Sequence, residues 1–203
     1  MKRIFVFSLA LIFILSFVAC KKDGDTIAPT STVQGDWKFV SIEAKLLNTT
    51  QYTEDGVNYK TTTTTNYTTV NNVGTMKIDP SSMSCINMAY GISTTSFGQS
   101  FENNVLVDTL SFPFSYDVPT FNSTATYKMV GSDSIYFSGG SFVFDQSSGN
   151  AIEGKPNGVK YKTSGNKMQF ISNYTETQSE TQDGILLIST NVANTTINFE
   201  KNQ

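Results

Sequence analysis

The sequence predicts an all-β protein, an antiparallel up-and-down β-barrel, on the strength of three observations. From residue 35 onward Thr, Ser, Asn, Tyr and Phe dominate, which favours strands, and no stretch shows helical spacing of apolar residues. Turn signals recur at short intervals, and one strand–turn–strand unit occurs twice. Consecutive hairpins form meanders, and a meander that closes into a barrel leaves no exposed edge. A β-sandwich is the alternative that the same pattern allows.

The N-terminal residues are typical of an export signal. Lys2 and Arg3 precede an apolar run from Ile4 to Val18, which ends at Ala19-Cys20. The run is shorter than the roughly 20 residues that a spanning helix needs. A cysteine after a small residue resembles the lipobox of bacterial lipoproteins, although Phe17 stands where that motif has an aliphatic residue. We expect residues 1–19 to be a signal peptide and Cys20 to be the lipidated first residue of the mature chain.

Residues 20–34 form the predicted tether. They are polar, contain Pro29 and lack aromatic residues. A flexible segment of this length spans about 20 Å, which is enough to hold a domain off a lipid surface. Lipidation implies an outer-membrane protein that is lipid-anchored on the periplasmic or the cell-surface face. The predicted domain then occupies residues 35–203.

The strands of this domain are predicted in order from their turn signals. Residues 35–42 open the first strand, and residues 48–72, polar on both faces, form either long exposed strands or a flexible insertion. Residues 135–144 read as a hairpin that turns at Gly139-Gly140. The apolar run Ile185–Ile188 reads as a strand buried on both faces, and residues 197–199 as the last strand. The other turn signals are Asp55-Gly56, Asn71-Asn72, Gly131, Gly149-Asn150, Asn157-Gly158, Gly165-Asn166 and Asp183-Gly184.

The repeated unit joins a Tyr-Lys strand to a second strand through a glycine-containing turn. The first copy runs from Tyr127 through Gly131 to Phe137, and the second from Tyr161 through Gly165 to Phe170. Two such hairpins in succession predict a meander over residues 127–170.

The composition excludes several classes of function. The chain has no histidine, and its only arginine is Arg3. Catalysis by a Ser-His-Asp or Cys-His site and an HExxH zinc site are therefore excluded. Removal of residues 1–19 leaves 12 of the 14 basic residues against 17 acidic ones. An acidic chain without a basic patch is a poor nucleic-acid binder, so nucleic acid is not an expected partner.

The catalytic and metal-binding motifs in this sequence are incomplete, so no enzyme activity, cofactor or metal is expected. Glu176 and Glu180 would lie about 13 Å apart on one strand face, farther than the carboxylates of a glycosidase. Residues 164–167 match Ser-x-x-Lys but span a turn, not a helix start. Residues 145–150, with Glu153, are rich in oxygen atoms, but their glycine is misplaced for a calcium loop. Cys85 reads as a small buried residue.

Gly35-Asp36-Trp37, followed by Lys38-Phe39-Val40, resembles the Gly-x-Trp start of the lipocalin family. The Tyr-Lys hairpins and the last strand are similar to the lipocalin-like domains of bacterial surface lipoproteins. The resemblance implies an eight-stranded barrel in which Trp37 closes the end away from the ligand mouth. Lipocalins commonly stack an arginine on that tryptophan; here Lys201 would take its place by a cation–π contact.

Three short matches resemble the Asp-Ser/Thr-aliphatic sites of a bacterial periplasmic O-glycosylation system, at Thr26, Thr109 and Ser134. Residues 21–25, Lys-Lys-Asp-Gly-Asp, resemble the charged export tag of surface lipoproteins; a solvated linker explains them equally well.

Two functions follow from these observations. The first is a lipid-anchored barrel that holds a small apolar or amphipathic ligand, as the lipocalin resemblance implies. The second is a structural, interaction or glycan-binding lipoprotein without a small-molecule ligand. A cavity continuous to the surface would favour the first, and a filled barrel or sandwich with a flat aromatic-and-amide face would favour the second.

Overall fold

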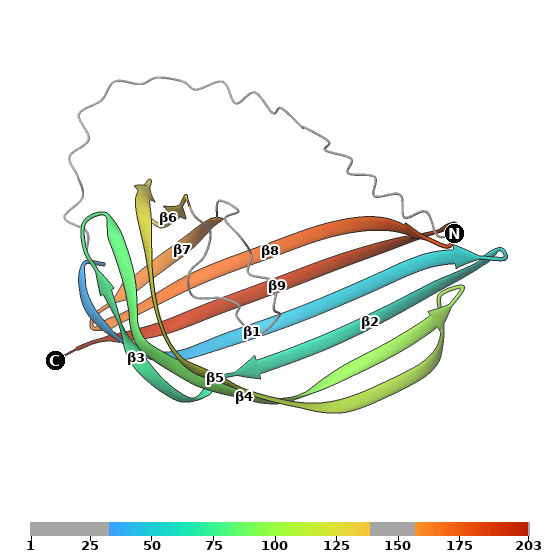
Figure 1. Ribbon diagram of the computed structural model, residues 1–203, viewed down its shortest axis with the longest axis horizontal. Helices are drawn as coiled ribbons and strands as arrows, with labels where there is room; N and C mark the ends of the chain where they lie inside the picture. Colours follow the sequence, from blue (N-terminus) through green and yellow to red (C-terminus); the bar gives the residue numbers. More distant parts are fainter. Residues whose placement is uncertain (1–32, 139–156, 203) are drawn as a thin grey trace, which may run out of the picture.

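The computed structural model describes residues 33–138 and 157–202, and it is a single antiparallel sheet that closes on itself (Figure 1). The strand order is β2-β1-β3-β4-β5-β6-β7-β8-β9, and pairing of β1 with β9 closes the ring. The predicted all-β, up-and-down barrel is therefore confirmed, and the sandwich alternative is not the fold. The strands are β1 (Gly35–Glu54), β2 (Val57–Thr68), β3 (Val70–Ile78), β4 (Ser82–Glu102), β5 (Val105–Val130), β6 (Ser134–Phe137), β7 (Asn157–Ser164), β8 (Lys167–Gln182) and β9 (Ile185–Lys201).

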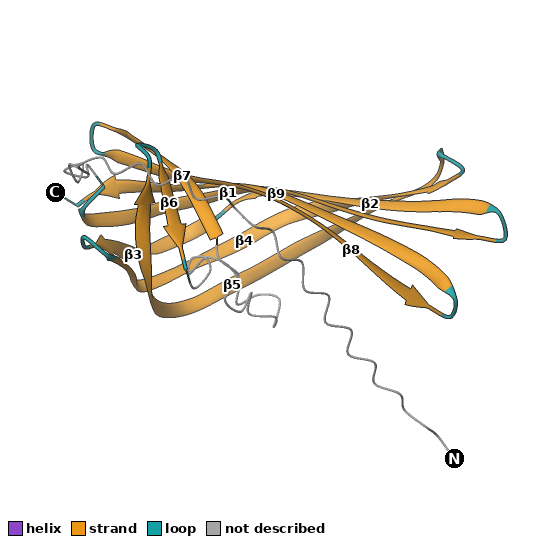
Figure 2. Ribbon diagram, turned by 90° about the horizontal axis from the view of Figure 1, so that it is seen from above, coloured by secondary structure: helices purple, strands orange, loops and turns teal. Residues whose placement is uncertain are grey.

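The molecule has two parts because the strands differ greatly in length. At the end of the molecule that holds Gly35 and Lys201, strands β1 and β3 to β9 form a closed barrel, and β2 takes no part in it. Six of the elements run on beyond it as an open sheet, in the order β8-β9-β1-β2-β4-β5. We call this part the projecting sheet; its three hairpins extend away from the barrel in Figures 1 and 2. Its strands are residues 43–54, 57–68, 93–102, 105–115, 172–182 and 185–196.

Each of the three hairpins ends in a two-residue turn. Asp55-Gly56, Asn103-Asn104 and Asp183-Gly184 have positive φ at both residues, between 48° and 84°. This geometry defines the type I′ turn, whose twist matches that of the flanking strands and which favours Asp, Asn and Gly. Two of these turns were predicted; Asn103-Asn104 was not.

The barrel interior is filled with side chains. Phe39, Phe170 and Phe199 lie at its centre with ring centroids 5.3 to 6.2 Å apart in tilted or edge-to-face geometry, and Tyr90 meets Phe39 edge-on at 5.9 Å. Burial of these rings supplies the main stabilisation of the fold. The other fully buried members include Trp37, Ile42, Met76, Ile78, Met83, Cys85, Met88, Ile135, Phe137, Met168 and Ile197.

The two copies of the sequence repeat form equivalent hairpins, as predicted. β5 pairs with β6 beyond Tyr127, and β7 pairs with β8 beyond Tyr161. Both tyrosine hydroxyls donate a 2.8 Å hydrogen bond to a turn carbonyl, from Tyr127 to Asp79 and from Tyr161 to Ser132. The repeat therefore fastens each hairpin to the turn beside it.

Two local predictions are wrong. Asn71-Asn72 is not a turn: it lies in an irregular part of β3, where the register with β4 shifts between Val70 and Val73. Asn157-Gly158 is the start of β7. β6 pairs with β5 on one side and with β7 on the other, and the predicted second arm, residues 141–144, lies outside the described residues. Gly139-Gly140 and Gly149-Asn150 lie outside the described residues.

The prediction for Ile185–Ile188 is also wrong. This run was expected to be buried on both faces, yet Leu186 is 53% exposed and Ile188 is 38% exposed. The run starts β9 at the far end of the projecting sheet, where the described residues form only one layer. By contrast, residues 48–54 and 57–68 form long, paired strands with a continuous register, which is one of the two structures predicted for residues 48–72.

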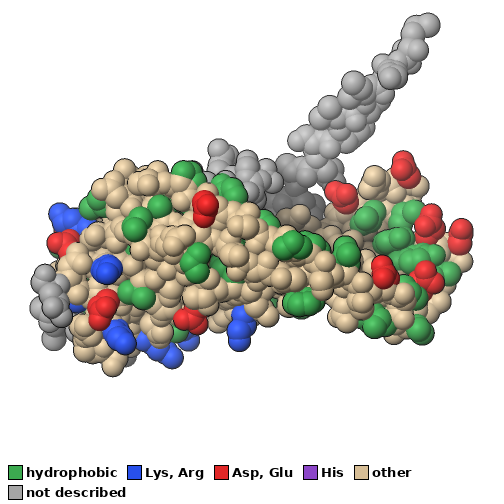
Figure 3. All heavy atoms as spheres, turned by 90° about the horizontal axis from the view of Figure 1, so that it is seen from below, with side chains coloured by type: hydrophobic (Ala, Val, Ile, Leu, Met, Phe, Trp, Pro, Cys, Tyr) green, Lys and Arg blue, Asp and Glu red, His purple; other side chains and the backbone are tan. Residues whose placement is uncertain are grey.

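Charged side chains are distributed unevenly along the molecule (Figure 3). Exposed lysines gather at the barrel, whereas acidic side chains gather at the tip of the projecting sheet. The barrel wall alternates apolar side chains inward with polar ones outward, as in Trp37-Lys38-Phe39. This is the reverse of a transmembrane barrel, whose lipid-facing side chains are apolar.

Candidate binding surface

The barrel floor gathers the three residues of the Gly-x-Trp resemblance. Trp37 is 1% exposed, and its Nε1 donates a 2.7 Å hydrogen bond to the carbonyl of Val33. The Nζ of Lys201 lies 5.5 Å from the Trp37 ring centroid, within the range of a cation–π contact. Gly35 has a φ of 120°, a conformation that other residues rarely adopt. These residues have structural roles, because the tryptophan is part of the buried core and its one polar atom is already hydrogen-bonded.

The interior that a small apolar ligand would occupy is packed with the barrel's own side chains. Large aromatic and methionine side chains reach the middle from strands on all sides. The observed barrel is therefore filled, which is the arrangement expected for the second of the two predicted functions. Groups that could bind a ligand lie on the surface.

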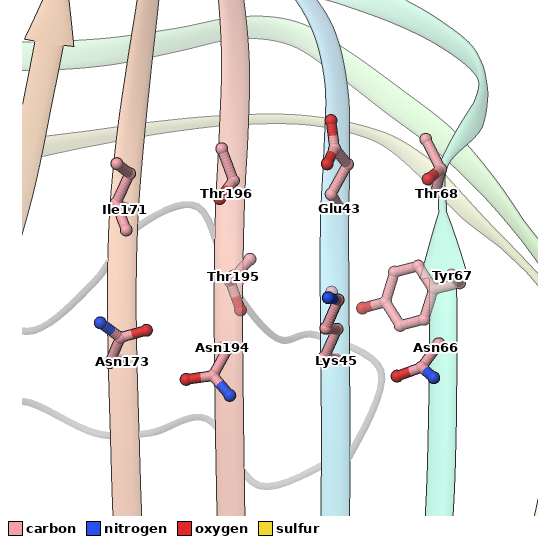
Figure 4. Close-up of a pocket in the computed structure, with 11 residues that line it drawn as sticks. Glu43, Lys45, Asn66, Tyr67, Thr68, Ile171, Asn173, Asn194, Thr195 and Thr196 are labelled. Atoms are coloured by element: carbon pink, nitrogen blue, oxygen red, sulfur yellow. The ribbon is translucent and has the colours of Figure 1, made fainter.

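A polar hollow of about 520 Å³ lies where the barrel wall continues into the projecting sheet (Figure 4). Strand register places side chains from four adjacent strands in two rows on the outer face, the face turned away from the barrel interior. The first row holds Ile171, Thr196, Glu43 and Thr68, and the second holds Asn173, Asn194, Lys45 and Asn66.

The hollow is rich in hydrogen-bonding groups and almost neutral. An asparagine amide supplies donors and acceptors in one plane, and threonine supplies both from one oxygen atom. Adjacent strands are about 4.8 Å apart, so the amide row extends over roughly 14 Å. Glu43 and Lys45 contribute one charge of each sign. The hollow can therefore bind an uncharged molecule that carries many hydroxyl groups.

A relay of amides fixes the carboxylate at one side of this hollow. The Nε2 of Gln169 donates to the Oδ1 of Asn198 at 2.8 Å, and the Nδ2 of Asn198 donates to the Oε1 of Glu43 at 2.9 Å. The same nitrogen lies 3.0 Å from the Oγ of Ser41. The relay holds Glu43 in one orientation before any ligand arrives. A second hollow of about 530 Å³ begins on the other side of Glu43, over β8 and β9 of the barrel.

The opposite face of the projecting sheet, which we call the inner face, is acidic. Register assigns Glu54, Glu102, Asp108, Glu176 and Glu180 to it. The face also carries polar pairs: the Nδ2 of Asn48 donates to Asn191 at 2.7 Å, and the hydroxyls of Thr50 and Ser189 lie 3.1 Å apart.

Tyrosines accompany the acids on the inner face. Tyr52 and Tyr59 stack with centroids 4.9 Å apart, and desolvation, followed by the charge of Glu102, raises the pKa of Tyr59. Tyr174 donates a hydrogen bond to Glu176, and this bond raises the pKa of Tyr174 to about 12.

Other candidate residues from the sequence are placed as follows. Glu176 and Glu180 share the inner face of β8. Ser164 pairs directly with Lys167 across the turn from β7 to β8. Cys85 is buried in the core, and this burial raises the pKa of its thiol to about 12. Within the described ranges, no cluster of His, Cys, Asp and Glu could hold a metal ion.

Of the possible modification sites, two are described. Thr109 is exposed on β5, and its backbone nitrogen donates to the Oδ1 of Asp108 at 2.8 Å. Ser134 starts β6, and its Oγ donates to Asp133 at 2.9 Å. Cys20, Thr26 and the loop of residues 145–150 lie outside the described residues.

Asn66, Asn173 and Asn194 were not identified from the sequence. Each lies in an Asn/Thr-rich strand, and only the register brings them into one row. An alternation of Asn with Thr in three separate strands was the available signal.

Comparisons with known proteins assign no family. No family model matches the chain, and no curated protein matches it. Among solved structures, the crystal structure of Ail, the attachment invasion locus protein of Yersinia pestis, is matched at 9% identity. The match covers 82% of this chain and 99% of Ail, with a TM-score of 0.16. At that score the two chains do not superpose as one fold, and the match carries no functional argument. In residues 33–138 and 157–202, no helix is long and apolar enough to cross a membrane.

Proposed function

We propose that this protein is a lipid-anchored, extracytoplasmic lipoprotein that binds an uncharged glycan on its surface. A lipocalin-like barrel serves as its base, and the hollow around Asn66, Asn173 and Asn194 is its binding site. Cys20 carries the lipid, and residues 21–34 lead from the outer membrane to the barrel floor.

The observation that carries the proposal is the contrast between the interior and the surface. The barrel lumen is filled with apolar side chains, whereas a preformed row of amides and hydroxyls lies open beside it. The hydroxyl groups of a glycan can pair with such amides and hydroxyls, because each of these groups both donates and accepts hydrogen bonds. The near balance of charge in the hollow favours a neutral sugar chain over an acidic one.

Saturation-transfer NMR with a panel of neutral oligosaccharides tests the binding site. We expect binding that Asn194→Ala weakens about fivefold, the equivalent of one hydrogen bond of about 1 kcal/mol. Asn191→Ala is the matched control, because Asn191 lies on the same strand but on the inner face. Binding that is lost equally in both variants, or absent from the whole panel, contradicts the proposal. If a fluorescent fatty acid binds in the barrel and an unlabelled apolar ligand displaces it, the result would instead favour a carrier of small apolar ligands.

A separate experiment tests the anchor. Cys20→Ala should move the protein from the membrane fraction to the soluble fraction, and labelling with a clickable fatty acid should be lost with it. If the variant still partitions into detergent like the original chain, the anchor is elsewhere. The result does not depend on whether a glycan binds.

A further inference from the structure

The projecting sheet has two faces of different character. Five of its six acidic strand residues lie on the inner face, and the sixth, Glu43, lies on the outer face at the boundary with the barrel. Farther from the barrel, the outer face consists of the residues from Lys45 to Thr53 of β1 that point to this side and the residues paired with them across the sheet. In the described strands, this part of the face carries two charged residues, Lys45 and Lys60. Lys60 is partly covered, since its Nζ lies 4.4 Å from the ring centroid of Phe101. Charge is therefore nearly absent from one face only.

This outer face also exposes apolar side chains at regular positions. Phe97 is 56% exposed, and Leu47, Leu186 and Ile188 are exposed as well. Threonines fill the positions between them: one row across the sheet reads Thr177, Thr190, Thr49, Thr62, Gln99 and Thr109. Depletion of charged residues is the compositional mark of the centre of a protein–protein contact.

We propose that the outer faces of two copies of this chain pack against each other, sheet on sheet. A sheet with an apolar face is ordinarily covered by a second layer, and within the described residues this one has none. Beyond the hollow, from Leu47 to Glu54 of β1, six strands about 4.8 Å apart and about eight residues long, at about 3.3 Å per residue, give a face of roughly 760 Å². Each partner in a standard stable interface contributes roughly 600–1,000 Å², so this part of the face is large enough and leaves the hollow uncovered.

The alternatives on the same sheet are less favourable. Two inner faces would bring their acids together. The β5 edge is poorly suited to strand addition, because Pro113 has no amide hydrogen and the amide of Thr109 is already bonded to Asp108. The barrel closes on the inner side, so it does not obstruct the outer face. A two-fold axis parallel to the strands would also place both barrel floors at the same end, as anchoring to one membrane requires.

Cysteine cross-linking with adjacent residues tests the proposal. Thr62 lies near the centre of the outer face, and Thr63 lies on the inner face with a similar degree of exposure. In the full chain in its own membrane, Thr62→Cys should form a covalent dimer with a short bis-maleimide, and Thr63→Cys should not. The unmodified chain gives the background, which should be low because the sulfur of Cys20 carries the lipid and Cys85 is buried. No dimer with Thr62→Cys, equal yields from both variants, or a product with a different protein would overturn the proposal.

Molar mass in solution gives a second test, by light scattering of the detergent-purified chain. We expect twice the mass of one chain, and a single-chain mass after Phe97→Asp. Leu110→Asp is the control, since Leu110 is similarly exposed but lies on the inner face. A single-chain mass for the unmodified protein, or dissociation by both substitutions, would overturn the proposal. If Cys20→Ala releases the protein from the membrane, both tests can be repeated on the released form, so failure of the anchor is distinguishable from failure of the dimer.

Discussion

Trp37 determines how the first strand enters the barrel. Its ring covers the apolar side chains at the floor, and its one polar atom is satisfied by Val33, four residues earlier. Burial of a large aromatic ring is strongly stabilising, whereas an exposed cation–π contact contributes only about 0.5–1 kcal/mol. Trp37 and Lys201 therefore touch each other but differ greatly in their expected contributions to stability.

Replacing these two residues separately should reveal that difference. Trp37→Ala should lower the free energy of unfolding by about 3–5 kcal/mol, a large part of the roughly 5–15 kcal/mol that stabilises a domain. Lys201→Ala should lower it by at most about 1 kcal/mol. Urea denaturation followed by circular dichroism measures both. Similar losses from the two variants would show that the ring is not the main contributor.

Cys85 should be chemically inert in the folded protein. Burial raises the pKa of its thiol from 9.0 to about 12, so the reactive thiolate is scarce at neutral pH. The native protein should not react with a thiol reagent at position 85 until denaturant is added. The unfolded thiol ionises first as the pH rises, so stability should decrease between pH 9 and 12. Cys85→Ser should reduce that dependence, and the remainder should come from tyrosines such as Tyr174, whose pKa is also raised. Rapid labelling of native Cys85 would contradict its burial.

Between the elements, Thr69 marks the boundary of the barrel and the projecting sheet. It separates β2 from β3, and it forms two hydrogen bonds with Ile42 of β1. The nitrogen of Thr69 donates to the Ile42 carbonyl at 2.9 Å, and the nitrogen of Ile42 donates to Oγ1 of Thr69 at 2.8 Å. A side chain thus completes the ladder where the backbone register is broken.

Removal of that hydroxyl should be costly although it preserves shape. Thr69→Val would leave the buried Ile42 amide unpaired, at a cost of about 1–3 kcal/mol. Thr69→Ser keeps the hydroxyl and loses one methyl group, at about 0.8 kcal/mol. Thermal unfolding of the two variants tests the assignment. If Thr69→Ser lowers the melting temperature as much as Thr69→Val, the hydroxyl is not the stabilising group.

The sequence predicted several strands and turns correctly, but it said less about which residues from other strands lie beside them. Asp55-Gly56 and Asp183-Gly184 predicted their turns because type I′ geometry demands those residues. Asn71-Asn72 carried the same signal, yet the chain continues as β3, since Asn71 can adopt its positive φ within an irregular strand as readily as in a turn. The hollow could not be predicted, because pairing between distant strands decides which asparagines become neighbours.

At the scale of the molecule, stability should be distributed unevenly. The barrel has a buried apolar core, but the projecting sheet depends on backbone ladders and on polar pairs such as Asn48–Asn191. Regions with few buried apolar contacts open locally at lower free energy than the whole protein unfolds. The filled interior and the single-layer sheet should therefore behave as separate cooperative units.

Native-state hydrogen exchange tests that division. Amides near the core, such as those of Phe39, Met76 and Phe199, should exchange only through global unfolding. Amides near the tip, such as those of Gln51, Tyr59 and Leu187, should exchange faster and with little dependence on low concentrations of urea. Uniform protection along β1 would show that the two parts open together.

The path of β1 has a mechanical consequence. This strand is fastened to the floor near Val33 and runs without a break to Glu54 at the far tip, paired on both sides over most of its length. A pull between the floor and the tip acts along the strand axis, so it shears the ladders on both sides and their hydrogen bonds share the load. A pull across one hairpin would instead break those bonds one after another. Held at one end and loaded at the other, the protein should resist tension best along its long axis.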